Sequence, residues 1–297
     1  MPPLKVLITG GSGLLGQYLN RELSRKVHIL TLYNTHTGNA TSYSSAKTDI
    51  RDYNSLKKIF DSFRPDVTVH TAAVSNPAVK GAEFDKPVYD INVKGTEQIA
   101  RLCEVYKCRL IYTSTDLVYA GYRGSMLSED AKLIPISLYA ETKLMGEQKI
   151  IRTFDNFIIL RTALLIGFGM NHSASHFDAL YRKLKEGKPS GLFTDQFRTP
   201  LSLPEAARII GELVYADISG EILNFGGPER VSRYEIGQML CALTTSDPAL
   251  LIQSKMSDLP NYPAVADVSM ATSKLNSFGI FQKPLEHSIK EMLKERK

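Results

Sequence analysis

Short apolar runs alternate with longer segments of helical period through the first half of the chain. The apolar runs cover Lys5 to Thr9, Val27 to Leu32, Val67 to Thr71, Arg109 to Ser114 and Phe157 to Arg161. Runs that are apolar throughout are typical of parallel strands covered on both faces. Between them, apolar positions of helical period predict helices at about Leu14 to Arg25, Tyr53 to Phe63, Val88 to Tyr106 and Ser137 to Thr153. This order predicts an α/β fold with a Rossmann-type, doubly wound parallel sheet.

The pattern is less regular after residue 162. Helical periods recur near Ser173 to Glu186 and Pro204 to Ala216, and a last helix is expected at Leu285 to Glu295. The segment Ser232-Arg-Tyr-Glu235 has the spacing of a capping box and predicts a helix that continues to about Leu243. We therefore expect a dinucleotide-binding domain over residues 1–162. Residues 163–297 should form mainly a smaller substrate-binding lobe, with elements that return to the main sheet.

Composition narrows the classes of function. A net charge of +5, spread along 297 residues of which 43% are apolar, fits a bound anion better than a nucleic acid. No apolar run approaches the roughly 18 residues of a membrane span, and the first strand pattern begins too early to leave room for a signal peptide. Cys103, Cys108 and Cys241 are odd in number and lack zinc spacing. We expect a reduced, cytoplasmic protein without a metal site or a membrane partner.

A glycine-rich loop, Thr9-Gly-Gly-Ser-Gly-Leu-Leu-Gly16, follows the first strand and opens the first helix. In this setting Gly10 permits a tight turn, Gly13 lets the backbone approach a pyrophosphate, and Gly16 lets the helix pack closely on the sheet. The helix N-terminus then offers N–H groups and a positive dipole end to the phosphates. We predict dinucleotide binding here and include Leu14 and Leu15 among the contacts.

The end of the second strand, Thr31-Leu-Tyr-Asn-Thr-His36, bears on the choice of cofactor. It offers no carboxylate for a ribose 2′-hydroxyl and no arginine for a 2′-phosphate. Asn34, Thr35 and His36 can donate hydrogen bonds to such a phosphate, which favours NADP and leaves NAD as the alternative. His36 can equally be a solvated loop residue.

Four tyrosines precede a lysine by four residues, a spacing that places both side chains on one helix face: Tyr43/Lys47, Tyr53/Lys57, Tyr139/Lys143 and Tyr181/Lys185. A nearby ammonium can stabilise a phenolate and make the tyrosine a usable proton donor. Only Tyr139/Lys143 follows a central strand, where hydride transfer beside a nicotinamide would occur. That strand ends in Ser114-Thr-Asp116, and we choose Thr115 as the hydroxyl that holds the reacting carbonyl. Short polar side chains at strand ends also cap turns, so turn capping is an alternative role for Ser114 and Asp116.

These motifs, together with Tyr139-Ala-Glu-Thr-Lys143-Leu-Met-Gly-Glu147, resemble the extended short-chain dehydrogenase/reductases. Val118-Tyr119 and Gly121, which follow Ser114-Thr-Asp116, are similar to the dTDP-4-dehydrorhamnose reductase branch, and the likeness spans nearly the whole chain. It implies reduction of a keto group on a nucleotide-linked deoxysugar, with a homodimer formed through the helices expected near residues 88–106 and 137–153. It also implies a catalytic group of Thr115, Tyr139 and Lys143, with Lys143 touching the nicotinamide ribose.

The resemblance also implies further contacts. Cofactor contacts are expected from Asp49, Ile50, Ala72, Ala73, Asn92 and Thr113, besides Tyr139 and Lys143. Substrate contacts are expected from Ser75, Asp116, Val118, Arg161 and Arg198. Arg161 ends an apolar strand and needs a carboxylate or phosphate partner.

Two departures concern the substrate. After Leu160-Arg-Thr162 the chain continues Ala163-Leu-Leu-Ile166, where these reductases have an aromatic pair, and Arg198 stands where they tend to have glycine. An arginine there can grip a diphosphate or exclude the sugar. A regulatory, non-catalytic cofactor-binding protein similar to the methionine adenosyltransferase beta subunit is therefore one alternative. A nucleotide-sugar epimerase or dehydratase is another.

Three histidines complete the candidates. His70, at a strand end, is expected to be a satisfied core residue. His172 and His176 have a spacing that can suggest a metal, but no third ligand lies nearby in the sequence, so we expect them to face solvent or substrate.

Overall fold

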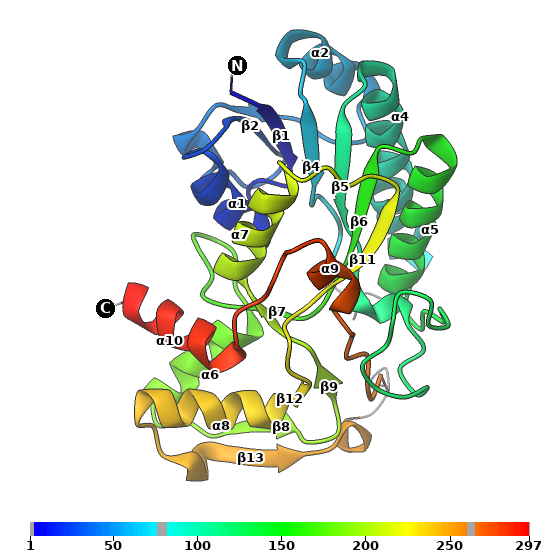
Figure 1. The fold of residues 1–297 in the computed structure, drawn as a ribbon. Coiled ribbons are helices and arrows are strands. Elements are labelled where there is room, and N and C mark those ends of the chain that lie inside the picture. The colour runs from blue at the N-terminus through cyan, green and yellow to red at the C-terminus, as the bar shows by residue number, and fades with distance from the viewer. Residues whose placement is uncertain (1–2, 76–81, 260–264, 297) are drawn as a thin grey trace.

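The computed structural model describes residues 3–75, 82–259 and 265–296, and its centre is a seven-stranded sheet (Figure 1). The strand order is β11-β6-β5-β4-β1-β2-β3, and every neighbouring pair is parallel. The strands are β1 (Lys5–Thr9), β2 (His28–Tyr33), β3 (Ser45–Lys47), β4 (Val67–His70), β5 (Arg109–Thr113), β6 (Phe157–Thr162) and β11 (Glu221–Phe225). The predicted Rossmann-type sheet is confirmed, while β3 and β11 were not individually predicted.

Helices cover both faces of the sheet, because successive strand side chains point to opposite sides. Val6 and Ile8 of β1 pack in a core cluster with α1 and α7, whereas Leu7 joins a second cluster with α2, α4 and α5. These helices are α1 (Leu14–Leu23), α2 (Tyr53–Phe63), α4 (Thr96–Tyr106), α5 (Leu138–Thr153) and α7 (Leu203–Leu213). The continuous apolar character of the strands thus has a direct structural cause.

Local capping sets where several helices begin. Asp52 accepts a hydrogen bond from Ser55 N at 3.1 Å before α2, and Ser137 accepts one from Ala140 N at 3.2 Å before α5. The predicted capping box is confirmed, since both bonds between Ser232 and Glu235 are present at the start of α8 (Arg233–Thr244). The final helix, α10, has the predicted bounds (Leu285–Glu295).

The helix expected over Val88 to Tyr106 differs from the prediction. It is a continuous run of α3 (Ala82–Tyr89), a π-helical segment (Asp90–Gly95) and α4. In the π-helical segment, the Asn92 side chain accepts a hydrogen bond from Val74 N at 2.8 Å and donates one to Val74 O at 3.1 Å. These bonds fix the segment that follows β4.

Residues after 162 contribute to two regions. α7 packs against α1 and β11 extends the sheet beside β6, so both return to the main body. The remaining elements form a lobe below the sheet in Figure 1, with its own cluster of buried apolar side chains. The lobe contains α6 (His176–Lys185), α8, α10 and three strand pairs: β7 (Leu165–Ile166) with β10 (Leu201–Ser202), β8 (Ser190–Phe193) with β13 (Leu251–Ser254), and β9 (Phe197–Arg198) with β12 (Val231–Ser232).

Shorter elements complete the chain. They are α9 (Ser273–Ser277) and the 3₁₀ helices η1 (Ala40–Ser42), η3 (Asp116–Val118), η4 (Pro248–Leu250) and η5 (Met256–Asp258). Of these, η3 follows β5 directly and bears on the site described below.

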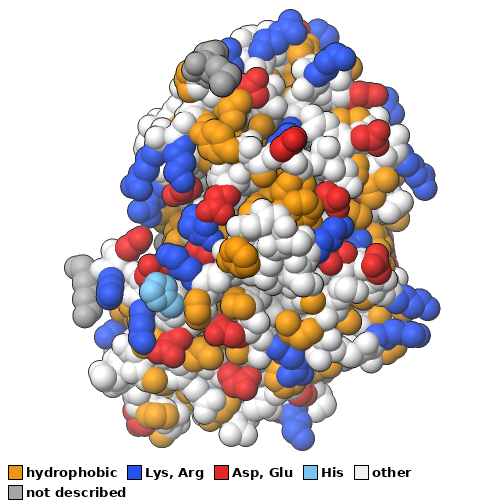
Figure 2. All heavy atoms as spheres, in the orientation of Figure 1, with side chains coloured by type: hydrophobic (Ala, Val, Ile, Leu, Met, Phe, Trp, Pro, Cys, Tyr) orange, Lys and Arg blue, Asp and Glu red, His pale blue; other side chains and the backbone are white. Residues whose placement is uncertain are grey.

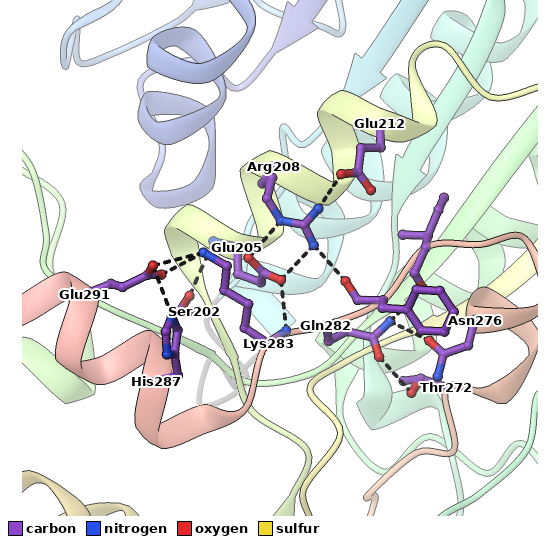
Figure 3. A network of polar contacts seen from close by, with 12 residues as sticks. Ser202, Glu205, Arg208, Glu212, Thr272, Asn276, Gln282, Lys283, His287 and Glu291 are labelled. Carbon is purple, nitrogen blue, oxygen red and sulfur yellow. Dashed lines mark hydrogen bonds and ion pairs between the residues drawn. The ribbon is translucent and has the colours of Figure 1, made fainter.

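A polar network joins the C-terminal segment to α7 (Figure 3). Glu205 on α7 accepts hydrogen bonds from Arg208 Nη2 at 2.7 Å and from Lys283 N at 3.0 Å. Arg208 Nη2 also donates to Phe281 O, and Lys283 Nζ lies 2.8 Å from Glu291 on α10. The network therefore connects α7 with both the segment before α10 and α10 itself.

Basic and acidic side chains are interspersed on the face shown in Figure 2, in agreement with the scattered charge of the sequence. Across the described residues, none of the helices combines the length and the apolar character required to cross a membrane.

Candidate functional site

A cleft of about 980 Å³ lies at the carboxyl ends of the central strands and extends to the lobe. Its walls include the glycine loop, the ends of β2, β4 and β5, the start of α5, and lobe residues around Gln196 and Arg233. In doubly wound folds ligands bind at this end of the sheet. The cleft is thus where the fold and the sequence motifs both place a dinucleotide.

The glycine loop forms one wall, and its glycines are required by close backbone contacts. Gly10 has a φ of +70°, and a Cβ there would lie 2.7 Å from Ala72 N. A Cβ on Gly16 would lie 2.2 Å from Gly10 O. Gly13 precedes α1 without any side-chain cap, and no acidic residue occupies the first turn. The N-terminal N–H groups of α1 are therefore suited to an anion such as a pyrophosphate.

The sequence-predicted cofactor residues lie along this cleft with one exception. Those that line it are Gly10, Gly13, Leu14, Leu15, Gly16, Asn34, Thr35, His36, Asp49, Ile50, Ala72, Ala73, Thr113, Tyr139 and Lys143. Asn92 is not among the lining residues, and its cofactor contact stays a prediction. Its side chain is fully buried against Val74 and Thr142, so it acts by holding the backbone of Val74, a lining residue.

At the end of β2, the side chains available to a ribose phosphate are polar but not acidic. The Asp49 carboxylate is engaged by Arg51, whose Nη2 lies 2.6 Å from Oδ2, and this hydrogen bonding lowers the pKa of Asp49. His36 stacks on His172, with ring centroids 4.4 Å apart. The stack joins the loop after β2 to a loop of the lobe.

Thr115, Tyr139 and Lys143 line the same cleft as the glycine loop. Thr115 caps η3 by accepting a hydrogen bond from Leu117 N at 3.3 Å, while Tyr139 and Lys143 lie one turn apart on α5. Burial raises the pKa of Tyr139 to about 12, and the adjacent Thr115 hydroxyl opposes that rise. Burial lowers the pKa of Lys143 to about 7, against the influence of Glu147. The arrangement can present a phenol proton to an oxygen atom in the cleft.

The substrate end of the cleft carries paired charges. Arg198 Nε lies 3.4 Å from Asp116 Oδ2, and both side chains are buried. Burial raises the pKa of the Asp116 carboxyl, and the Arg198 guanidinium opposes that effect. Ser75 also lines the cleft. Of the five predicted substrate residues, Ser75, Asp116 and Arg198 therefore line the same cleft as the catalytic candidates.

Arg161 and Val118 are not among the residues that line the cleft, and their substrate contacts stay predictions. Arg161 Nη2 forms a buried ion pair with Glu147 Oε2 at 3.0 Å, and its Nη1 donates to the Tyr119 hydroxyl at 3.0 Å. The expected partner of this buried guanidinium is thus a carboxylate of α5. Val118 is fully buried in a core cluster with Tyr119 and Met270.

Several lining residues were not predicted from the sequence. Gln196 and Arg233 approach from the lobe, where Arg233 Nε donates to Gln196 Oε1 at 3.1 Å. Gln196 lies two residues before Arg198, which the sequence did predict. His176, expected to face solvent or substrate, lines the cleft, and His70 is fully buried between Thr9 and Thr96 as a core residue. In the described part of the chain, no cluster of three or more His, Cys, Asp or Glu residues is placed to hold a metal.

Comparison with known proteins places this site in a family. The family model described as RmlD substrate binding domain matches residues 4–297. The chain belongs to the RmlD substrate binding domain family. The chain is also 27% identical to methionine adenosyltransferase 2 subunit beta of Xenopus laevis over 310 residues, which cover 99% of this chain and 88% of that protein.

Two reductases are similar to this family member. dTDP-4-dehydrorhamnose reductase of Mycobacterium tuberculosis is 27% identical over 250 residues, covering 82% of this chain and 77% of that protein. The crystal structure of dTDP-4-dehydrorhamnose reductase from Bacillus anthracis in complex with NADP has a TM-score of 0.86 at 20% identity and covers 99% of this chain and 100% of that one. The extended short-chain dehydrogenase/reductase resemblance is confirmed by the family match and by the shared fold.

Proposed function

We propose that this protein reduces a keto group on a nucleotide-linked deoxysugar with NAD(P)H. The observation that carries the proposal is that Tyr139 and Lys143 line the same cleft as the glycine loop. A phosphate seat and a proton donor in one cleft are what hydride transfer to a carbonyl requires. The similarity to dTDP-4-dehydrorhamnose reductases supports this reaction class.

The residues of the cleft fit a nicotinamide dinucleotide. The cradle of Gly10, Gly13 and Gly16, which side chains would fill, suits the pyrophosphate at the uncapped start of α1. When bound, the reduced nicotinamide supplies hydride to the carbonyl carbon. The Asp49 carboxylate is engaged by Arg51 and is not free to accept a hydrogen bond from a ribose 2′-hydroxyl. The cleft is also lined by Asn34, Thr35 and His36, which can donate hydrogen bonds to a 2′-phosphate. These residues favour NADP, with NAD as the alternative.

The protein's own contribution is a proton and two hydrogen-bonding groups. Tyr139 Oη donates its proton to the carbonyl oxygen as negative charge develops there, and Thr115 Oγ1 donates a hydrogen bond to the same oxygen. Burial raises the pKa of Tyr139 to about 12, and the Thr115 hydroxyl opposes that rise. In the proposed mechanism, the Lys143 ammonium stabilises the phenolate that remains after proton transfer. Donors already in place around that oxygen favour the transition state over the ground state.

The substrate end supports an anionic ligand. Arg198 and Arg233 provide two guanidinium groups, and Asp116 and Ser75 add hydrogen-bonding oxygens. Guanidinium groups are suited to diphosphates. We assign these residues to a nucleotide-sugar. A homodimer through α4 and α5 and a cytoplasmic location are part of the same proposal. The location is supported by three free, buried cysteines.

One observation favours a second candidate function. The methionine adenosyltransferase beta subunit is similar over nearly the whole chain, so a regulatory cofactor-binding role is the alternative. Epimerase or dehydratase chemistry would use the same tyrosine and lysine with retained NAD. It would show tightly held cofactor after purification and no net oxidation.

The test is NADPH oxidation, followed by absorbance, with a panel of 4-keto-6-deoxysugar nucleotides. We expect turnover with at least one of them and a loss of about 10²- to 10⁴-fold in Tyr139→Phe with cofactor binding retained. Tyr53→Phe is a matched control, because Tyr53 also precedes a lysine by four residues but is 41% exposed on α2. Absence of oxidation across the panel, with NADPH binding intact, would favour the regulatory alternative. Full turnover in Tyr139→Phe would refute the assigned role.

A further inference from the structure

The ammonium of Lys143 has an unusual environment. The residue is buried, with 1% of it exposed, and it lines the cleft. Among the described residues, none forms a hydrogen bond or ion pair with its Nζ, and Glu147 acts on it through charge alone. The ammonium instead makes a cation–π contact, because Nζ lies 4.0 Å from the centroid of the Tyr112 ring. Burial removes part of the water around a cation and destabilises its charged form, whereas the negative face of an aromatic ring within about 6 Å attracts the cation.

We propose that Tyr112 is a positioning residue for Lys143. Its ring face holds the ammonium at the floor of the cleft and favours the charged form of the lysine. The consequence for catalysis rests on the proposed function, since only a charged Lys143 stabilises the Tyr139 phenolate.

The Tyr112 ring is itself fixed from three sides. It belongs to β5 and is fully buried, and its hydroxyl donates a hydrogen bond to Lys143 O at 3.4 Å. Gly146 on α5 makes room for this hydroxyl, because a Cβ there would lie 2.5 Å from Tyr112 Oη. On the β4 side, the His70 ring stacks on Tyr112 with centroids 5.5 Å apart. The ring therefore cannot turn away from the lysine without disturbing two neighbouring elements.

The other titratable groups nearby do not replace the ring. Glu147 raises the pKa of Lys143, but its carboxylate is occupied by Arg161 and by the Ser114 hydroxyl. His70, on β4, is held neutral because burial and the charge of Lys143 lower its pKa to about 3.

Two more groups face this wall. Tyr139 precedes Lys143 by one turn, and Asp116 on η3 acts on Tyr139 by raising its pKa. Neither makes a hydrogen bond or ion pair with Lys143 Nζ in the described part of the chain. The ring face of Tyr112 is thus the contact that offsets part of the loss of water around the ammonium.

Nuclear magnetic resonance of the whole protein labelled with [6-¹³C]lysine tests this directly. The Lys143 signal is assigned by its loss in Lys143→Met. In the wild type and in Tyr112→Phe, which keeps the ring, we expect upfield-shifted ε-methylene protons from the ring current. In Tyr112→Leu the upfield shift should vanish and the titration midpoint of Lys143 should fall by about one pH unit.

A matched control is Phe60→Leu, which removes a buried ring from the same apolar cluster without touching Lys143. It should leave both the shift and the midpoint unchanged. Absence of the upfield shift in the wild type would overturn the proposal even if Tyr112→Leu failed to fold. A midpoint in Tyr112→Leu that is unchanged or higher would overturn it as well.

Turnover gives a second readout and separates the two proposals. With an active substrate, the alkaline limb of the kcat profile should move to lower pH in Tyr112→Leu and remain in place in Tyr112→Phe. Failure of every variant and of the wild type to oxidise NADPH would refute the reductase function. The ring-current and titration results would still test the role of Tyr112, because they do not depend on turnover.

Discussion

Replacing Arg161 by Met tests whether this residue supports the fold rather than the substrate. The guanidinium and the Glu147 carboxylate are 4% and 0% exposed, and they are joined through Nε and Nη2. Nη1 also donates to the Tyr119 hydroxyl and to Glu129 O at 2.8 Å. Removing the guanidinium takes the countercharge away from the buried Glu147 carboxylate. Among the described residues, the Ser114 hydroxyl then remains as its side-chain hydrogen-bond donor. Breaking a buried pair in this way costs about 3–5 kcal/mol of unfolding free energy.

Urea unfolding followed by circular dichroism measures this loss. The double variant Arg161→Met/Glu147→Leu should recover part of it, because it leaves no unpaired buried charge. NADPH affinity should change little in the single variant. A loss below about 1 kcal/mol, together with a large rise in substrate KM, would refute the structural role and return Arg161 to the substrate site.

Two further predictions concern the sheet and the loop. Gly16→Ala should weaken NADPH binding more than about 10-fold, because its Cβ would lie 2.2 Å from Gly10 O. Fluorescence titration measures this affinity. Gly211→Ala, whose Cβ would lie 3.7 Å from its nearest neighbour, should bind NADPH like the wild type, and equal affinities of the two variants would contradict the reasoning. Burial lowers the pKa of His70 to about 3 in the folded protein, against about 6.5 in the unfolded chain. Below about pH 6.5 the unfolded chain therefore binds one more proton than the folded protein. The free energy of unfolding should fall as the pH is lowered from about 6.5 to 3, by up to ~1.4 kcal/mol per pH unit. His70→Gln should lose this part of the slope in urea titrations, whereas His287→Gln, at an exposed site, should keep it; an unchanged slope in His70→Gln would contradict the assignment.

The periodic parts of the chain could be predicted from sequence because their patterns have local causes. β1 and α2 lie at the predicted residues, since one is a buried apolar run and the other a capped amphipathic helix. β11 was not predicted as a strand, because its five residues gain their hydrogen bonds from β6, far away in the sequence. The π-helical segment likewise depends on a distant contact, the hydrogen bonds between Asn92 and Val74.

The site was predictable where a motif has one geometric solution. The glycine loop and the Tyr139/Lys143 turn meet this condition, and both line the cleft. The partner of Arg161 could not be predicted, because a strand end can face either the cleft or a covering helix, and Glu147 comes from α5. Lobe residues such as Arg233 escaped prediction, since nothing in their local sequence shows that the lobe folds back over the strand ends.

The most direct test of the central claim is the fate of the hydride. Incubation with NADPH that carries deuterium at both C4 positions and the panel of keto-sugar nucleotides should place one deuterium on the former carbonyl carbon of at least one sugar, detectable by mass spectrometry and proton resonance. In Tyr139→Phe the same label should appear about 10²- to 10⁴-fold more slowly. A sugar product without deuterium, or unchanged sugar alongside bound NADPH, would contradict hydride transfer in this cleft.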